Sequence, residues 1–379
     1  MPPHLARALF LSGSIGNGHD VVAEACSSAL EPFGVASSTL DSMALLGRGP
    51  AVVGEWMFRQ ALSVSTFYDA FHFSQLRRDG WLGRAADNAG VTRVLPAMRA
   101  ELARFDPQLI VAVFATGAGV AARLRAEGLA ARSIVVVTDS LAHRMWVHQP
   151  TDLFLVTGRA AAESVRQYWP EAPIRVISPP VRPGIALAPS KADARLALGV
   201  PLKAPCVLLM SGAWGLGPLD QVALALAAEG IWVLAVAGSN RRLERSLEVM
   251  ARTDQRILAF GFTDGVPELM AACDVVVTSS GNTCHEARAI GRGMVIIDVV
   301  PGHGRENLQH QLELGGAAAS LPTAGSIVRS VRAFLADPDR SQVRPHSRDA
   351  GAEFVEAVRS LGFELPSEAQ QAGRPESDA

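Results

Sequence analysis

Short apolar runs alternate with longer amphipathic stretches along most of the chain. In the first half the apolar runs are "ARALFL", "PQLIVAVF", "SIVVVTDS", "DLFLVTG" and "PIRVIS". In the second half the alternation is cleaner, with the runs "CVLLM", "IWVLAVAG", "RILAFGF", "DVVVTS" and "GMVIIDVV", each followed by a glycine turn or a helical pattern. Wholly apolar strands separated by helices are typical of parallel sheets covered on both faces. The pattern therefore predicts an α/β protein with two Rossmann-like doubly wound sheets.

A proline-rich segment separates the two alternations. Residues 178–184 read "SPPVRPG", which suits neither a helix nor a strand. We therefore predict a first domain over residues 1–178, a second over 185–345 and a C-terminal helix over 346–364. Residues 365–379 lack apolar periodicity, and we expect a disordered tail there.

Composition excludes several classes of protein. The 379 residues suffice for two hydrophobic cores. With 35 basic and 37 acidic residues the net charge is −2, and no basic run stands out, which argues against nucleic-acid binding. The four cysteines show no C-x-x-C pairing, so we expect core thiols in a reducing compartment and no zinc site. The chain holds no apolar run of membrane-spanning length and no signal peptide, which predicts a cytoplasmic protein.

Residues 56–81 break the alternation, because this one segment holds seven of the chain's 22 aromatic residues. Phe67 and Phe71 lie four apart and would share one face of a helix, with Arg77 and Arg78 just beyond. Aromatic rings edged by arginine suit a membrane interface or an acyl-chain groove. The alternative is a core helix packed on the first sheet, and periodicity alone favours it slightly.

Glycine-rich turns follow three of the predicted strands. They read "SGSIGNGHD" at residues 12–20, "SGAWGLG" at 211–217 and "TSSGNTCHE" at 278–286. Glycine lets backbone N–H groups approach a ligand closely, and the N-terminus of the following helix favours an anion. Two such turns in the second half suggest a bound diphosphate, although each could be a simple connection.

Polar side chains follow the same strands of the second half. Glu286 lies about one turn into a helix, where it could accept two ribose hydroxyls or simply interact with the helix dipole. The loop "PGHGREN" places His303, Glu306 and Asn307 at the same edge, where they could bond sugar hydroxyls.

A possible general base lies in the first half. The stretch "VVVTDSLAHRMWVHQ" puts Asp139 at the end of a strand, followed by His143 and His148. Facing His19 across a cleft, these groups could take a proton from an attacking hydroxyl, although single histidines are more often structural. No Asp-x-Asp pair suited to a divalent metal under a diphosphate occurs, so helix N-termini would carry the charge of the leaving group.

These motifs resemble the monogalactosyldiacylglycerol synthase and processive diacylglycerol glycosyltransferase family, which belongs to glycosyltransferase family 28. The family is related to the peptidoglycan lipid-linked N-acetylglucosaminyltransferase. The stretch "GFTDGVPELMAACDVVVTSSGNTCHEARAIGRGMVIIDVVPGHGREN" is similar to its uridine-diphosphate (UDP) sugar site in order and spacing. "LLMSGAWGLGPL" resembles its donor-domain glycine loop, "VVTDSLAHRMWVH" its Thr-Asp stretch followed by His and Trp, and "GNGHD" its Gly-Gly-Gly-His turn. The resemblance covers about residues 8 to 325.

The resemblance implies a GT-B fold, in which two Rossmann-like domains face each other across a cleft, and it implies roles for individual residues. The backbone at Phe262 would read uracil, Glu286 would hold ribose, and His303 and Asn307 would touch the sugar. The diphosphate would lie among residues of three turns: Gly16, Gly18, Gly212, Trp214, Gly215, Gly217, Ser280, Gly281, Asn282 and Thr283. The catalytic residues would be His19, Asp139 and His143, with the base open between His19 and Asp139.

The chain departs from the family pattern at several positions. Asn17 replaces a glycine, Asp20 an arginine and Arg144 a proline. His303 and Gly304 stand where the family usually has Gln-Glu, which leaves the sugar open between galactose, glucose and N-acetylglucosamine.

The function implied by the resemblance is that of an inverting hexosyltransferase of the EC 2.4.1 class, which needs neither a metal nor a cofactor. It would transfer a hexose from a UDP-sugar to a lipid such as diacylglycerol, at the inner face of the cell membrane, with residues 56–81 as the membrane surface. The alternatives are a transferase acting on a soluble acceptor, a nucleotide-sugar 2-epimerase and an inactive UDP-sugar-binding protein.

Overall fold

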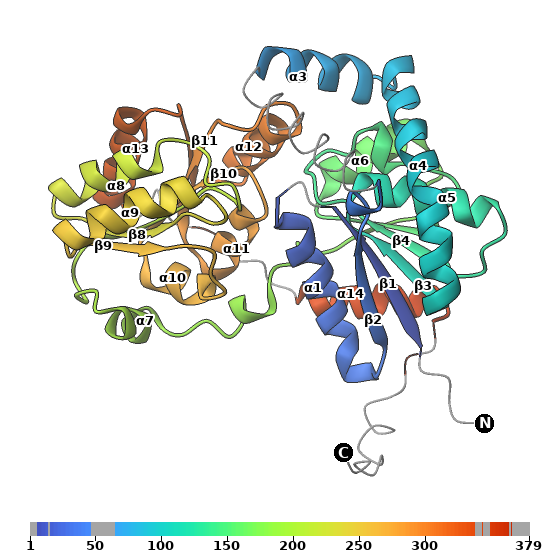
Figure 1. Cartoon of the computed structure of the whole chain (residues 1–379), viewed down its shortest axis with the longest axis horizontal. Coiled ribbons are helices and arrows are strands. Elements are labelled where there is room, and N and C mark those ends of the chain that lie inside the picture. The colour runs from blue at the N-terminus through green and yellow to red at the C-terminus, as the bar shows by residue number, and fades with distance from the viewer. Residues whose placement is uncertain are drawn as a thin grey trace, which may run out of the picture.

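The structure, a computed structural model, describes residues 6–13, 16–46, 65–337, 343, 349–363 and 365. Two parallel sheets of six strands each form two halves of the molecule, which lie side by side (Figure 1). Helices cover both faces of each sheet, so the central strands are buried along all or nearly all of their length. The predicted α/β architecture with two doubly wound sheets is confirmed.

The first half has the strand order β2-β1-β3-β4-β5-β6. Its strands are β1 (Arg7–Ser12), β2 (Ala36–Asp41), β3 (Leu109–Ala112), β4 (Arg132–Val136), β5 (Leu153–Val156) and β6 (Ile174–Val176). Its helices are α1 (Gly18–Leu30), α3 (Ser65–Phe71), α4 (Trp81–Phe105), α5 (Ala115–Ala126) and α6 (Arg159–Tyr168). The sequence pattern missed β2, because this edge strand reads "ASSTLD" and is only partly buried.

The second half has the strand order β12-β11-β10-β7-β8-β9. Its strands are β7 (Cys206–Met210), β8 (Trp232–Val236), β9 (Ile257–Phe260), β10 (Val275–Ser279), β11 (Gly293–Ile297) and β12 (Ala317–Ser320). Its helices are α7 (Lys191–Leu198), α8 (Leu219–Ala228), α9 (Arg241–Thr253), α10 (Val266–Ala272), α11 (Thr283–Ile290), α12 (His303–Glu313) and α13 (Ala324–Ala336). The pattern also missed the edge strand β12. Like β2, this strand is only partly buried, and its sequence "AAAS" is not a strongly apolar run.

The strand order reverses once in each sheet, between β1 and β3 and between β7 and β10. The loops that leave neighbouring strands at such a point run to opposite faces, and the crevice between them is where α/β proteins bind ligands. All three glycine-rich turns follow a strand at these two points, namely β1, β7 and β10. The topology therefore places the predicted ligand turns where a ligand site is expected.

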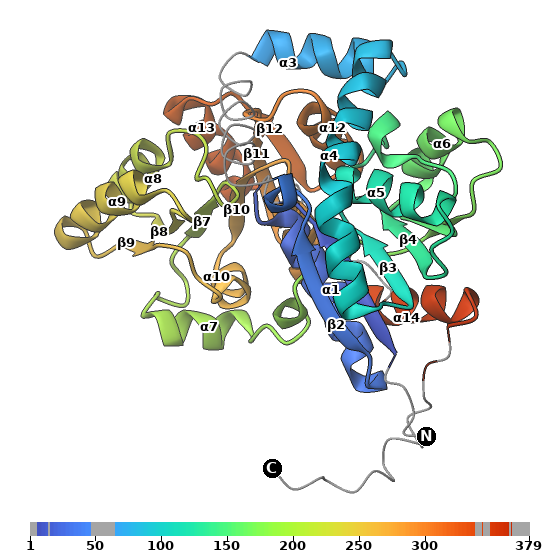
Figure 2. The same cartoon turned by 45° about the vertical axis from the view of Figure 1, so that its right-hand side comes forward.

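The C-terminal helix α14 (Ala350–Ser360) belongs to the core of the first half. Its Phe354 and Val358 are fully buried beside Phe10 of β1, and both cartoon views show α14 beside α1 (Figure 2). The side chain of Asp349 caps the helix by accepting hydrogen bonds from the N–H groups of Gly351 and Ala352. The chain therefore crosses between the halves twice. Of the predicted disordered tail only residue 365 is described, and the rest lies outside the described residues.

The aromatic segment is a broken helix. In it, α3 is followed by one turn of π-helix, η3 (His72–Leu76), and then by α4, which runs down the first half. Trp56 lies outside the described residues. Phe73 and Trp81 are 40% and 68% exposed, whereas His72 and Leu76 are buried, so the described part of the segment has one buried and one exposed side. Among the described residues, none of the helices is both long and apolar enough to cross a bilayer.

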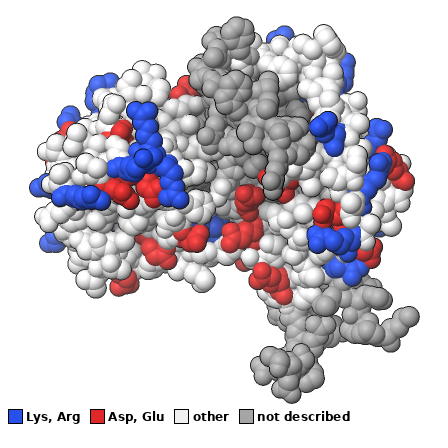
Figure 3. Space-filling model, viewed as in Figure 1, with Lys and Arg blue, Asp and Glu red and all other residues white. Residues whose placement is uncertain are grey.

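Short 3₁₀ turns complete the described chain: η1 (Glu31–Phe33), η2 (Ala44–Leu46), η4 (Arg144–Trp146) and η5 (Pro183–Ile185). All four cysteines are buried thiols, as predicted. On the face shown in Figure 3, basic and acidic residues are intermixed, and the densest basic group lies over the half that carries α9. This helix contributes Arg241, Arg242, Arg245 and Arg252.

Candidate active site

One deep cleft lies between the two halves, and both contribute to its walls. Its free space, counted out to the open solvent, is about 1280 Å³. Residues of the β1–α1 turn and of the loop after β4 form one wall, and the loops after β7, β10 and β11 form the other. Such a cleft is large enough for a nucleotide-sized ligand.

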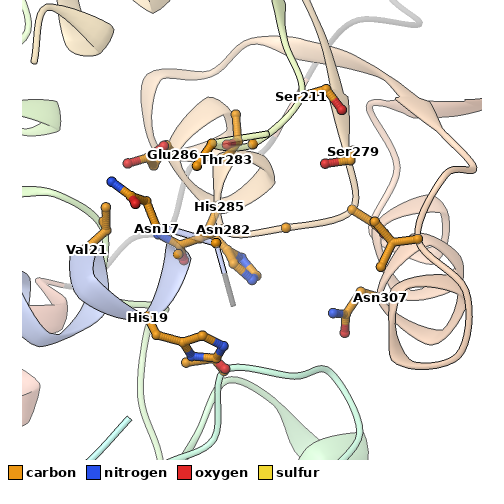
Figure 4. Close-up of a pocket in the computed structure, with 18 of the residues that line it drawn as sticks. Asn17, His19, Val21, Ser211, Ser279, Asn282, Thr283, His285, Glu286 and Asn307 are labelled. Atoms are coloured by element: carbon orange, nitrogen blue, oxygen red, sulfur yellow. The ribbon is translucent and has the colours of Figure 1, made fainter. Parts of the chain in front are cut away.

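The N-termini of two helices from different halves meet in this cleft (Figure 4). Helix α1 begins at Gly18 and α11 begins at Thr283, and a Cβ atom placed on Gly18 would lie 3.6 Å from the Cβ of Asn282. Because α1 starts earlier than the sequence pattern suggested, His19 lies in its first turn rather than in the preceding loop. Each helix N-terminus presents unpaired N–H groups and a partial positive charge, so the two together favour an anion between them.

The turn after β10 offers several hydrogen-bond donors to this position. Among the described residues, the N–H groups of Ser280, Asn282 and Thr283 have no acceptor, whereas Gly281 N–H donates to Ser279 O at 2.9 Å. The Nδ2 atom of Asn282 is buried and likewise has no partner there. Buried donors without acceptors cost free energy unless a ligand binds them. The turn is therefore suited to phosphate oxygens.

The loop after β7 is fixed by hydrogen bonds to its carbonyl groups. Ala213 O accepts hydrogen bonds from the N–H and the hydroxyl of Ser239, both at 2.7 Å, and Trp214 O accepts one from Asn240 Nδ2 at 3.2 Å. Gly238 allows this contact, because a Cβ there would lie 2.4 Å from Ala213 O. With its carbonyls tied back, the loop presents Ser211, Gly212 and Ala213 to the cleft, and Ser211 Oγ is buried without a partner among the described residues.

Glu286 lies on α11 and is almost completely buried, with Arg182 as its partner. The Arg182 Nε atom donates to Glu286 Oε1 at 2.6 Å. Burial raises the pKa of Glu286, and the charge of Arg182 opposes this shift only in part. Arg182 was missed by the sequence analysis, which treated residues 178–184 as a linker only. In the structure this linker also carries a side chain of the cleft wall.

His19 is held in one orientation by its neighbours. Its Nδ1 atom lies 2.7 Å from Val113 O, and its ring makes an edge contact with Phe114 at 4.9 Å between ring centres. Because a carbonyl only accepts, Nδ1 carries the proton, and Nε2 of the neutral ring keeps its lone pair. Burial lowers the pKa of His19, and the carboxylate of Asp139 partly offsets this shift. His19 is therefore neutral at neutral pH and able to accept a proton.

Asp139 lies beyond the end of β4, with hydrogen bonds to both carboxylate oxygens. Trp146 Nε1 donates to Oδ2 at 2.9 Å, and Asn307 Nδ2 donates to Oδ1 at 3.3 Å. Burial alone would raise the pKa of Asp139, but the nearby His303 and His143 and the Trp146 hydrogen bond outweigh it and lower the pKa. Asp139 is therefore a carboxylate at neutral pH, and it reaches the second half through Asn307.

His143 lies behind Asp139 and does not line the cleft. Its Nε2 atom is 3.8 Å from Asp139 Oδ2. Burial lowers the pKa of His143 to about 3, with Asp139 opposing the shift. His143 was expected among the catalytic residues; in the structure it is not one of the residues that line the cleft, and it lies next to Asp139, which is.

Three polar residues of α12 face the first half. Asn307 Oδ1 accepts hydrogen bonds from the N–H and the hydroxyl of Ser140, at 2.8 and 2.7 Å. His303 Nδ1 lies 3.2 Å from the hydroxyl of Tyr68. Both carboxylate oxygens of Glu306 are taken by His72 and Arg77. Of the three, only His303 and Asn307 line the cleft.

Most of the expected site residues line the cleft together: Gly16, Gly18, His19, Asp139, Gly212, Trp214, Ser280, Gly281, Asn282, Thr283, Glu286, His303 and Asn307. Gly215, Gly217 and Phe262 do not. Gly215 instead packs against Leu243, and the ring of Phe262 is 63% exposed on the loop after β9. The sequence analysis did not assign Arg182, Ser140 or Ser211, because a linker arginine and single serines carry no motif.

The arrangement of two Rossmann-like halves across a ligand cleft defines the GT-B class of folds, and solved structures agree. MurG of Acinetobacter baumannii matches with a TM-score of 0.54 at 13% identity, covering 94% of this chain and 99% of that one. The UDP-GlcNAc 2-epimerase of Neisseria meningitidis, bound to UDP-GlcNAc, matches with a TM-score of 0.61 at 10% identity, covering 94% and 100%. At such identities the likeness concerns the fold alone.

Sequence comparison identifies the relatives within this class. The family model described as monogalactosyldiacylglycerol (MGDG) synthase matches residues 19–181. The processive diacylglycerol beta-glucosyltransferase of Bacillus subtilis is 24% identical over 341 residues, which is 88% of each chain. A probable monogalactosyldiacylglycerol synthase of Nicotiana tabacum is 30% identical over 231 residues, or 56% of this chain and 43% of the plant protein. The chain thus spans less than half the length of this plant relative. The resemblance seen in the motifs is confirmed: the chain is similar in sequence to members of this family.

Proposed function

We propose that this protein is an inverting glycosyltransferase that moves a hexose from a UDP-sugar to the hydroxyl of diacylglycerol or a related glycolipid. The observation that supports it most is the pair of helix N-termini, α1 and α11, which meet beside buried donors without acceptors. The similarity to diacylglycerol glycosyltransferases supports the choice of reaction.

In the proposed complex the diphosphate lies between the turn after β10 and the loop after β7. The N–H groups of Ser280, Asn282 and Thr283 and the hydroxyl of Ser211 donate to its oxygens. These donors are worth most when negative charge develops on the departing UDP, because they are fixed before the reaction starts. Glu286 accepts from ribose hydroxyls through the carboxylate oxygen that Arg182 does not hold.

His19 is the proposed general base. The acceptor hydroxyl gives its proton to His19 Nε2 while its oxygen attacks the anomeric carbon from the side opposite the diphosphate. The bond from that carbon to the diphosphate oxygen breaks, and UDP leaves with the electron pair. Asp139, with hydrogen bonds to both its oxygens, is better placed to stabilise the imidazolium charge than to take the proton itself.

No metal or cofactor takes part in this proposal, because backbone donors and helix N-termini supply the stabilising charge. Within the described ranges, no group of three or more His, Cys, Asp or Glu side chains has a geometry suited to a metal ion.

The lipid acceptor is proposed to reach the cleft from a membrane surface on the side of α3 and α4. The exposed side chains of Trp81 and Leu82 are the described residues suited to contact with the bilayer. This surface would place the protein peripherally on the inner face of the cell membrane.

The test is to incubate the protein with UDP-galactose, UDP-glucose or UDP-N-acetylglucosamine and vesicles that contain diacylglycerol, with chelator present. A new glycolipid, detected by mass, and its loss in His19→Ala are expected. Transfer only to soluble acceptors would overturn the lipid assignment. Turnover of the donor without any acceptor would indicate an epimerase, and binding of UDP without turnover an inactive protein.

A further inference from the structure

The segment from Tyr68 to Arg77 is here called the strap. It comprises the end of α3 and the π-helical turn η3, and it leads toward α4 in the first half. The strap packs on the N-terminus of α12 in the second half. The Tyr68 hydroxyl lies 3.2 Å from His303 Nδ1. Asp69 Oδ1 accepts a hydrogen bond from the N–H of Gly302 at 2.6 Å, and its other oxygen is paired with Arg305. The strap thus contacts the turn that carries His303 into the cleft.

Glu306 anchors the strap one turn further along α12. His72 Nε2 lies 2.9 Å from Glu306 Oε2, and Arg77 Nε lies 3.0 Å from Oε1. His72 is completely buried, and Arg77 also donates to Ala142 O in the loop that follows Asp139. Glu306 does not line the cleft, and both its carboxylate oxygens are bound by strap residues, so its role is to hold the strap.

The shapes of the strap and the turn also fit each other. Gly302 has φ +62°, and a Cβ there would lie 2.6 Å from Tyr68 Cε1 and 3.0 Å from His72 Cβ. Only glycine allows both this backbone conformation and this approach. The contact is therefore a built interface between the halves, with both hydrogen bonds and close packing.

We propose that the strap determines how the protein recognises the donor hexose, with Tyr68 as the positioning residue that orients the ring of His303. This inference rests on the proposed function. His303 and Asn307 both line the cleft and lie one turn apart on α12. Figure 4 shows Asn307 on the side of the cleft away from Glu286, so a ligand that extends past the diphosphate meets this part of α12. A nucleotide without a sugar does not reach this end of the cleft, so its binding is independent of the strap.

The test compares UDP with UDP-hexoses as ligands of the full-length protein. Tyr68→Phe removes the hydroxyl and keeps the ring against Gly302. We expect unchanged affinity for UDP, an affinity for the preferred UDP-hexose lowered about five- to tenfold, and altered kcat/KM ratios among UDP-glucose, UDP-galactose and UDP-N-acetylglucosamine. In a His303→Ala background the same substitution should have no further effect, because the two residues act through one contact.

Tyr168→Phe is the matched control. The Tyr168 hydroxyl donates to the strap carbonyls of Leu76 and Arg77, at 3.3 and 2.9 Å, and does not touch His303. This variant should bind UDP and the UDP-hexoses like the wild type. An equal loss of UDP-hexose affinity in both variants would overturn the specific role of Tyr68.

Two further outcomes separate the inference from the proposed function. If the wild type binds UDP and Tyr68→Phe keeps both its UDP-hexose affinity and its sugar preference, the strap has no such role and the proposed function stands. If the wild type binds no UDP, both the proposed function and the inference about the strap are wrong.

Discussion

The two ends of the cleft differ in how their polar groups are satisfied. At the diphosphate end, Ser211 Oγ and Asn282 Nδ2 are buried without partners among the described residues, and the donors come mainly from the second half. At the sugar end, three residues of α12 interact with the first half. His303 contacts Tyr68, Glu306 contacts His72 and Arg77, and Asn307 contacts Ser140 and Asp139. One end is a preformed site for an anion, and the other is assembled by contact between the halves.

This difference indicates which step each end controls. Most donors at the diphosphate end belong to loops of the second half, so they can bind the nucleotide whether or not the halves are in contact. The N-terminus of α1 adds to them from the first half. Contacts made across the halves contribute only when the cleft is closed, which is when the acceptor and the sugar meet. Substitutions at the first end should therefore change the affinity for UDP itself. Those at the second should leave UDP affinity nearly unchanged and alter turnover and recognition of the sugar.

The largest effect is expected for His19→Ala. His19 touches the reacting hydroxyl in the proposed mechanism, so its loss should lower kcat by about 10²-fold or more while UDP affinity changes little. Steady-state kinetics together with direct UDP titration would measure both. A variant with near-normal kcat would move the role of base to Asp139.

The same change, Asn to Asp, at the two ends gives the sharpest comparison. Asn282→Asp places a carboxylate where the diphosphate binds, so UDP affinity should fall by about 10- to 100-fold. Without ligand this variant should be more stable by up to about 1 kcal/mol, because an acidic residue favours the N-terminus of α11.

Asn307→Asp keeps the acceptor for Ser140 but faces Asp139 with a second carboxylate, which repels it. This variant should lose kcat and thermal stability and keep its UDP affinity within about twofold. Calorimetric titration and thermal unfolding of both variants are the measurements. Equal losses of UDP affinity would show that the two ends do not differ as described.

A smaller effect is expected for Glu286→Ala. In the proposed complex the carboxylate holds ribose in both the ground state and the transition state, so its loss should mainly raise the donor KM, by about tenfold, with kcat nearly unchanged. Glu286→Gln, which keeps one acceptor, is the control and should raise KM less. A fall in kcat with unchanged KM would contradict the ribose assignment.

The smallest expected effect is on the pH dependence. The base must be neutral, and burial lowers the pKa of His19 from 6.5, so kcat/KM should begin to fall only below that pH. Asp139 raises this pKa, so Asp139→Asn should move the acid limb to still lower pH, with a lower plateau. A limb that moves to higher pH would show that another group is being titrated.

The sequence predicted residues at both ends of the cleft, but not how the sugar end is held. His303 and Asn307 line the cleft as expected, whereas Gly215 and Gly217 do not. Glycine turns after β7 and β10 carry a local pattern, because backbone donors depend only on strand, turn and helix following in order. Tyr68 and His303 lie 235 positions apart, and no periodicity or motif relates them. The aromatic segment was weighed as a membrane surface or a core helix. The structure shows that its polar side chains contact α12, while Trp81 and Leu82 remain exposed.

The amino-acid sequence by itself determined the two doubly wound sheets and the glycine-rich turns that line the cleft, since apolar periodicity and glycine placement act over a few residues. Only the tertiary structure decided that Arg182 of the linker pairs with Glu286 and that His143 lies behind Asp139. It also decided that α14 returns to the first core and that the strap reaches α12. These contacts join segments distant in the chain, and their partners are chosen by how the two halves pack rather than by local preference.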